Sequence, residues 1–164
     1  MGPQRLGAGV TVNAVAGTVG RMVDFHLQRF LDAQDAAGTY DSALVELRKG
    51  RKRGHWMWFV FPQLTGLGRS TTAQRYAISG PAEAQAYLDH PVLGPRLVAC
   101  ARALIESQAT DPVEVLGAVD AQKLKSSMTL FASVEHSDSV FTAVLDRFYA
   151  SSLDEATTSR LRVN

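Results

Sequence analysis

The residues best suited to chemistry lie between Lys52 and Gln63, in the run KRGHWMWFVFPQ. Trp56 and Trp58, the two tryptophans of the chain, are two positions apart in this run. Two indoles on one face of a strand can clamp a flat ring by stacking, and neighbouring cations can hold a phosphate. The run therefore favours a nucleotide-like ligand, with these candidate contacts: Lys52, Arg53, His55, Trp56, Trp58 and Gln63.

Core packing is the competing interpretation of the same run, and aromatic runs serve as core more often than as binding sites. Each buried ring contributes about 1.5–3 kcal/mol by leaving water. A buried indole N–H needs a hydrogen-bond partner, however, which makes two neighbouring tryptophans costly as filler alone. For His55 the alternative to a role in the site is an ordinary hydrogen bond, and for Gln63 it is a hydrogen bond to the backbone.

Five basic residues in six positions, Arg48 to Arg53, precede the aromatic run. Cations at the end of a helix interact favourably with its dipole, by about 0.3–1 kcal/mol each, so a solvated turn explains them. The functional alternatives are a phosphate clamp formed by Lys52 and Arg53, or a docking surface for a partner.

A second block, Lys123 to Phe131, places Leu124, Ser127, Met128 and Phe131 on one helical face. Ser127 in that stripe either lets another helix approach closely or points into a pocket, which Lys123, one turn earlier, would also reach. Glu46 lies close in sequence to the basic run and is our candidate catalytic carboxylate. Asp120 is interpreted as a helix cap.

Several classes of site are disfavoured by the sequence. The four histidines lack HxxxH or HExxH spacing, and Cys100 is the single cysteine, so we expect no metal and no disulfide. No phosphate-loop or GxSxG motif is present, and we expect no cofactor. A net charge of +1 argues against a dedicated nucleic-acid binder, and no apolar run reaches the roughly 18 residues of a membrane span. We expect a cytoplasmic protein.

Apolar spacing predicts a mainly α fold, a compact bundle of short helices with a minor β element. Expected helices cover about 23–38, 39–50, 71–77, 81–88, 91–105 and 112–117, and others begin near 120, 138 and 154. The segment 55–61 is rich in β-forming residues and predicts a short buried strand, although a buried helical turn shares its pattern. Residues 1–21 predict a flexible extension, followed by a single helical domain over 22–162.

Five segments also carry a family resemblance: DFHLQRFLDAQD (24–35), the run from Tyr40 to Ser70, AQRYAIS (73–79), AQAYLDHPVLGPRL (84–97) and LKSSMTLF (124–131). The chain resembles the bacterial and fungal domain-of-unknown-function family eighteen-ten over roughly 24–161. Some members carry the label calpastatin, but calpastatin repeats are disordered whereas this chain has a dense apolar pattern. The resemblance implies a mainly helical fold and supplies no established activity.

That family is in turn distantly similar to NADAR domains, which act on N-glycosidic bonds of ADP-ribosylated or riboflavin-pathway compounds. This is an analogy at the level of the fold, from which no catalytic residue is carried over. Two hypotheses stay open: a pocket that binds or hydrolyses a nucleotide or ADP-ribose-type ligand, and a non-enzymatic interaction domain whose aromatic run is core. The sequence leaves open whether the protein is an enzyme, and its oligomeric state.

Overall fold

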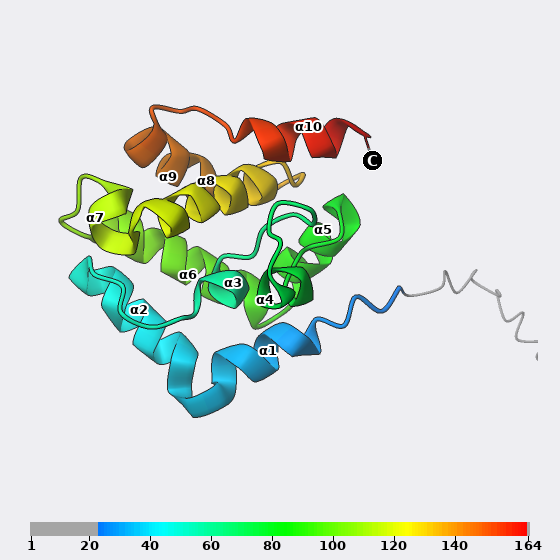
Figure 1. Ribbon diagram of the computed structural model, residues 1–164, viewed down its shortest axis with the longest axis horizontal. Helices are drawn as coiled ribbons and strands as arrows, with labels where there is room; N and C mark the ends of the chain where they lie inside the picture. Colours follow the sequence, from blue (N-terminus) through cyan, green and yellow to red (C-terminus); the bar gives the residue numbers. More distant parts are fainter. Residues whose placement is uncertain (1–22, 164) are drawn as a thin grey trace, which may run out of the picture.

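Helices account for most of residues 23–163, the part of the chain that the computed structural model describes (Figure 1), which confirms the mainly α prediction. The predicted extension, residues 1–21, lies outside this range. The elements in order are α1 (Gln28–Asp35), the 3-10 turn η1 (Ala36–Gly38), α2 (Thr39–Lys49), α3 (Met57–Val60), α4 (Thr71–Arg75), α5 (Pro81–Asp89), α6 (Leu93–Glu106), α7 (Pro112–Leu116), α8 (Ala118–Ala132), α9 (Val140–Tyr149) and α10 (Glu155–Val163).

The core is built around α6 and α8, which both pack against α5 and α9 (Figure 1). Helix α6 also packs against α2, and α8 also packs against α7 and α10. The apolar stripe predicted for α6 is buried, since Leu97 and Leu104 are both excluded from solvent. Helix α8 is buried along most of its second half, from Leu124 to Phe131. A helix covered on nearly all sides has little contrast between its faces, which is why its stripe in the sequence is less regular.

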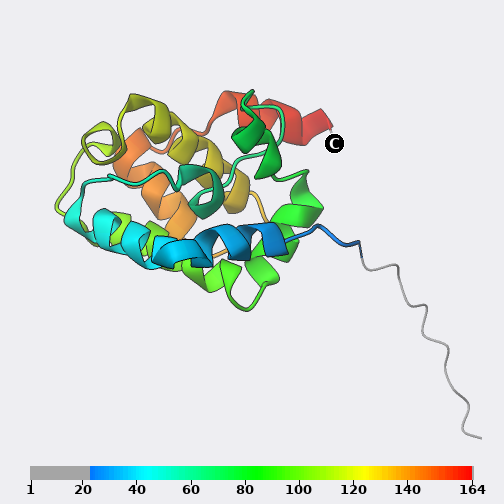
Figure 2. The same cartoon turned by 60° about the horizontal axis from the view of Figure 1, so that its bottom comes forward.

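Helices α1 and α2 form a V whose corner is η1 (Figure 1). Ala37 (φ 52°) and Gly38 (φ 66°) both adopt left-handed backbone there, which ends α1 and restarts the chain in a new direction. Figure 2, in which the bottom of the molecule in Figure 1 comes forward, shows α3 beside the pair of helices α1 and α2. The first helix begins at Gln28, later than the predicted start at about residue 23.

The predicted strand over 55–61 is wrong, because Met57–Val60 forms the short helix α3. The backbone N–H of Val60 donates to the carbonyl of Trp56 at 3.1 Å, and that of Phe61 donates to Met57 at 3.1 Å. An apolar run buried on all sides satisfies a helical turn as well as a strand, so burial alone does not decide between them. Within residues 23–163, β structure is limited to an isolated parallel bridge between Leu64 and Ile78.

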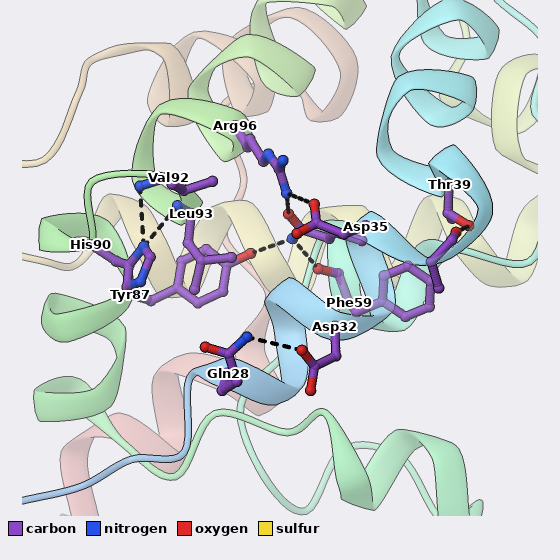
Figure 3. Close-up of polar contacts among 12 residues, drawn as sticks. Gln28, Asp32, Asp35, Thr39, Phe59, Tyr87, His90, Val92, Leu93 and Arg96 are labelled. Carbon is purple, nitrogen blue, oxygen red and sulfur yellow. Dashed lines mark hydrogen bonds and ion pairs between the residues drawn. The ribbon is translucent and has the colours of Figure 1, made fainter.

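A buried glutamine holds α3 from the side of α1. The side-chain amide of Gln34 donates to the backbone carbonyl of Phe59 at 2.8 Å and to the Tyr87 hydroxyl at 3.2 Å (Figure 3). Arg96 on α6 donates to the other end of that amide at 3.2 Å and to Asp35 at 2.8 Å. Because each buried polar atom of Gln34 has a partner, the network fixes α3 without an unpaired group.

A second buried polar pair ties α1 to α5. The Arg29 guanidinium donates to Glu83 at 2.7 Å and to four backbone carbonyls. Glu83, on α5, also accepts the backbone N–H of Ser79 at 2.6 Å.

In the described residues, no helix is both long and apolar enough to cross a bilayer.

Candidate functional site

The turn after α2 bends the chain back over the side chain of Glu46. Gly50 (φ 72°) ends α2 in the left-handed conformation that glycine adopts without strain. One carboxylate oxygen of Glu46, Oε2, then accepts three N–H groups: backbone Arg53 at 2.8 Å, backbone Gly54 at 3.1 Å and the Trp56 indole at 2.8 Å. Glu46 therefore fastens the whole 53–56 segment to α2.

These contacts set the ionisation of Glu46. Partial burial is the largest single influence and raises the pKa of this carboxyl group. The N–H donors of Arg53, Gly54 and Trp56 and the charge of Lys52 together outweigh burial, so the net pKa is lowered. Glu46 is accordingly a carboxylate at neutral pH, with one oxygen already saturated by donors.

The opposite wall of the site is the first half of α8. Lys52 Nζ lies 2.9 Å from Asp120 Oδ2, and Lys123 Nζ lies 3.4 Å from Asp120 Oδ1. The Lys52 ammonium is 5.3 Å from the ring centroid of Trp56, and the Lys123 ammonium is 4.8 Å from that of Trp58. Each lysine thus contacts one indole and the same carboxylate, a favourable arrangement for a partly desolvated cation.

Asp120 joins the two lysines of this cluster, a role that the sequence did not indicate. We predicted a helix cap, which is wrong because α8 begins two residues earlier, at Ala118. Asp120 instead lies in the first turn, between two lysines. The Asp120 and Lys123 spacing of three residues was a detectable signal of pairing on a helix.

The two tryptophans have different environments. Trp56 is 1% exposed, its N–H is bonded to Glu46, and its ring packs 6.3 Å from that of Phe61. Trp58 is half-buried. Because the segment turns into a helix at Met57, the two side chains do not share one face as they would on a strand. Trp56 is core, and Trp58 has ring surface open to solvent.

The other candidates divide between surface and interior. Arg53 and His55 are exposed. Gln63 is half-buried and follows α3, where its backbone carbonyl accepts the N–H of Ile78 at 2.8 Å. Ser127 is fully buried one turn after Lys123, and its hydroxyl has no hydrogen-bond partner among residues 23–163. Contacts in the structure therefore link Glu46, Lys52, Trp56, Trp58 and Lys123, and none of these contacts involves the side chain of Gln63.

The basic run is split by the fold. Lys52 turns inward, and its backbone N–H donates to the carbonyl of Val115 at 2.8 Å. The remaining cations are exposed and make no ion pair within residues 23–163. We call these four residues the basic turn: Arg48, Lys49, Arg51 and Arg53.

A shallow hollow of about 380 Å³ lies beside Glu46, on the outer side of α2. Asp41, Ser42 and Val45 are its other lining residues. Asp41 gives this hollow a negative charge that makes no ion pair within residues 23–163, and such a charge opposes a phosphate group. The hollow and the basic turn therefore have opposite electrostatic preferences.

Comparison with known proteins gives a family and a fold. Residues 24–161 match the model of a family described as protein of unknown function (DUF1810). The crystal structure of the conserved hypothetical protein Rv1873 from Mycobacterium tuberculosis is similar, with a TM-score of 0.82 and 49% sequence identity. The match covers 85% of this chain and 99% of that one. Among curated proteins, none matches this chain.

Proposed function

The chain belongs to the DUF1810 family. We propose that it is a non-enzymatic binding module that engages an anionic partner through the basic turn. The observation that supports this proposal most strongly is the division of the cations. Lys52 and Lys123 are both paired with Asp120, whereas Arg48, Lys49, Arg51 and Arg53 face solvent.

The interior charges supply the reason for this division. Two lysines and two carboxylates, Asp120 and Glu46, balance one another where the aromatic segment meets α8. The other four cations of the run from Arg48 to Arg53 make no ion pair within residues 23–163 and form the basic turn. Clustered surface cations raise the local concentration of an anionic partner and accelerate its association, an effect that salt screens within about 8–10 Å.

The aromatic segment then acts as the support of the binding surface. Glu46 holds the backbone of Arg53 and Gly54, and the buried Trp56 ring anchors the end of the turn. A Cβ at Gly54 would lie 2.8 Å from Trp56 Cδ1, so the close approach of ring and backbone requires glycine here. A rigid backbone loses little entropy on binding, which favours affinity.

Binding of a labelled acidic peptide, such as an alternating Glu–Ser decamer, tests the proposal. Changing Lys49, Arg51 and Arg53 together to Glu should abolish binding, and added salt should weaken binding by the native protein. The matched control changes three exposed arginines elsewhere, Arg69, Arg75 and Arg162, to Glu. Equal loss in both triple variants would mean that net charge alone matters, and the proposal would be rejected.

A nucleotide-type ligand is the second candidate, favoured by Trp58. Its half-buried ring lies under the Lys123 ammonium, and the unpartnered Ser127 hydroxyl follows one helical turn later. A base stacked on Trp58 and a phosphate on Lys123 would use these groups. Hydrolysis of an N-glycosidic bond would then fall to Glu46.

This candidate has its own assay. AMP and ADP-ribose should raise the melting temperature, and Trp58→Ala or Lys123→Ala should remove the shift. Lys125→Ala is the control, because Lys125 lies 6.0 Å from the ring of Tyr149, on another side of the same helix. Release of free base that Glu46→Gln stops would identify hydrolysis. Absence of both a shift and a released base would eliminate the candidate.

A further inference from the structure

A hollow of about 550 Å³ lies between α10 and the loops that flank the β-bridge, on different elements from the basic turn. Sites for small molecules commonly measure about 300–1,000 Å³. This hollow is larger than the one beside Glu46, and its residues are not among the candidates that the sequence indicated. Its lining consists of Leu64, Thr65, Ser79, Ala156, Ser159, Arg160 and Val163.

The lining combines an apolar floor with a small set of polar groups. Leu64 is buried and supplies apolar surface together with Ala156 and Val163. Thr65, Ser79 and Ser159 contribute hydroxyl groups, and Arg160 contributes a full charge. A mostly apolar hollow with a few convergent polar groups is the usual composition of a small-molecule site.

The exposed guanidinium of Arg160 contacts the backbone at Gly66. Its Nη2 donates to the backbone carbonyl of Gly66 at 3.1 Å. Gly66 has a φ of 88°, and a Cβ at this position would lie 2.5 Å from Arg160 Nη1 and 2.8 Å from its Cζ. Glycine thus lets the guanidinium pack directly against the backbone.

The charge of Arg160 is not neutralised by any side chain of the residues that the structure describes. Within residues 23–163 it makes no ion pair, and the bond to Gly66 uses one of its five N–H donors. The remaining donors include a fork that matches the two oxygens of a carboxylate or phosphate.

Helix α10 is itself fixed to the core, which keeps Arg160 at the hollow. Asp154 Oδ2 accepts the backbone N–H of Thr157 at 3.0 Å and its hydroxyl at 2.5 Å. The other oxygen accepts the side-chain amide of Gln122, on α8, at 2.8 Å. Thr157 is fully buried. Ala156 and Arg160 lie one turn apart, as do Ser159 and Val163, so one face of this anchored helix lines the hollow.

We infer that this hollow binds a small organic anion, a carboxylate or phosphate monoester with an apolar body. Arg160 holds the anionic group, the hydroxyls complete its hydrogen bonds, and Leu64 and Val163 contact the body. This inference stands on the hollow and on Arg160, and it does not depend on the function proposed for the basic turn.

Phenyl phosphate and benzoate are suitable probes, followed by backbone amide chemical shifts of the full chain. Saturable shifts should appear at Thr65, Ser79 and Ser159. Arg160→Gln should weaken binding by about 10- to 100-fold, since a hydrogen-bonded charge typically contributes 1.5–3 kcal/mol. Arg160→Lys keeps the charge but loses the forked pair of N–H donors, so its affinity for the probes should lie between those of the native protein and Arg160→Gln. Arg162→Gln, an exposed arginine of the same helix outside the hollow, should bind as the native protein does.

Gly66→Ala provides a second, independent variant, because its methyl group displaces the Arg160 guanidinium. It should weaken binding in the native background and have little further effect in Arg160→Gln. The absence of saturable shifts with both probes would overturn the inference, as would equal weakening by Arg162→Gln. Inorganic phosphate binding as tightly as phenyl phosphate would also overturn it, since an organic body would then contribute nothing.

Discussion

Replacing Glu46 is expected to destabilise the fold by removing the acceptor of three N–H groups. In Glu46→Ala, the backbone N–H groups of Arg53 and Gly54 regain water, because both residues are partly or fully exposed. The Trp56 indole N–H is attached to a ring that is 1% exposed and loses its partner. An unsatisfied buried donor costs about 1–3 kcal/mol, and bonds to a charged acceptor contribute about 1.5–3 kcal/mol.

The expected loss for Glu46→Ala is therefore about 2–4 kcal/mol of unfolding free energy, since the exposed donors are compensated by water. At roughly 2–4 °C per kcal/mol for a chain of this size, the melting temperature should fall by about 4–16 °C. Glu46→Gln keeps an acceptor oxygen without the charge and should lose about 1–2 kcal/mol. Urea unfolding followed by far-UV circular dichroism and tryptophan fluorescence measures both.

The pH dependence of the same pair of proteins gives a sharper test. The folded-state pKa of Glu46 is lowered from its ordinary value of 4.5, so the unfolded chain binds its proton more readily. The carboxylate therefore contributes stability above about pH 4.5, and that contribution is lost as the pH falls through the folded pKa. The stability difference between the native protein and Glu46→Gln should be constant near neutral pH and shrink below this range.

Glu106→Ala is the control, since Glu106 is exposed at the end of α6 and should change stability by less than about 0.5 kcal/mol. A loss for Glu46→Ala no larger than that of the control would refute the assignment of Glu46 as the anchor of the 53–56 segment. A difference from Glu46→Gln that does not change with acid would refute the ionisation argument.

Three further substitutions test the interior. Ser127→Ala should stabilise the protein by about 0.5–1.5 kcal/mol in urea unfolding. The substitution removes a buried hydroxyl that has no partner among residues 23–163, and alanine has the higher helix propensity. Destabilisation would show that the hydroxyl is hydrogen-bonded. Arg29→Ala should cost about 3–5 kcal/mol by leaving the Glu83 carboxylate buried without its cation, and Glu83→Gln in the same chain should restore part of this loss; no recovery would contradict the pairing. Burial raises the pKa of Cys100 to about 12. A thiol reagent at pH 8 should therefore label the folded chain at least about a hundredfold more slowly than the unfolded chain. Equal labelling rates would contradict the burial of Cys100.

Sequence spacing alone was sufficient for the helices with one buried face. In α6 and α9 the apolar residues recur at helical spacing, and the structure buries Leu97, Leu104, Phe141 and Val144 as that spacing predicts. Chain reversals were equally local, since Gly50 at the end of α2 has the left-handed conformation that a glycine after two basic residues indicates. These features depend on a residue and its near neighbours, which the sequence displays directly.

Tertiary contacts decided the features that depend on distant partners. Trp56 and Trp58 have the same type and the same local setting, yet Glu46 and Phe61 enclose one ring while Lys123 covers part of the other. Met57–Val60 is helical, although its residues alone suit a strand equally well.

The charged groups followed the same rule. Lys52 and Arg53 are neighbours in sequence, but Lys52 pairs with Asp120 on α8 whereas the side chain of Arg53 is exposed. Arg160 lies 94 residues from the glycine that holds it. Residue types and periodicity thus determined which helices form and where cations concentrate. Which of those cations are neutralised and which remain available to a ligand was decided by packing between segments far apart in the chain.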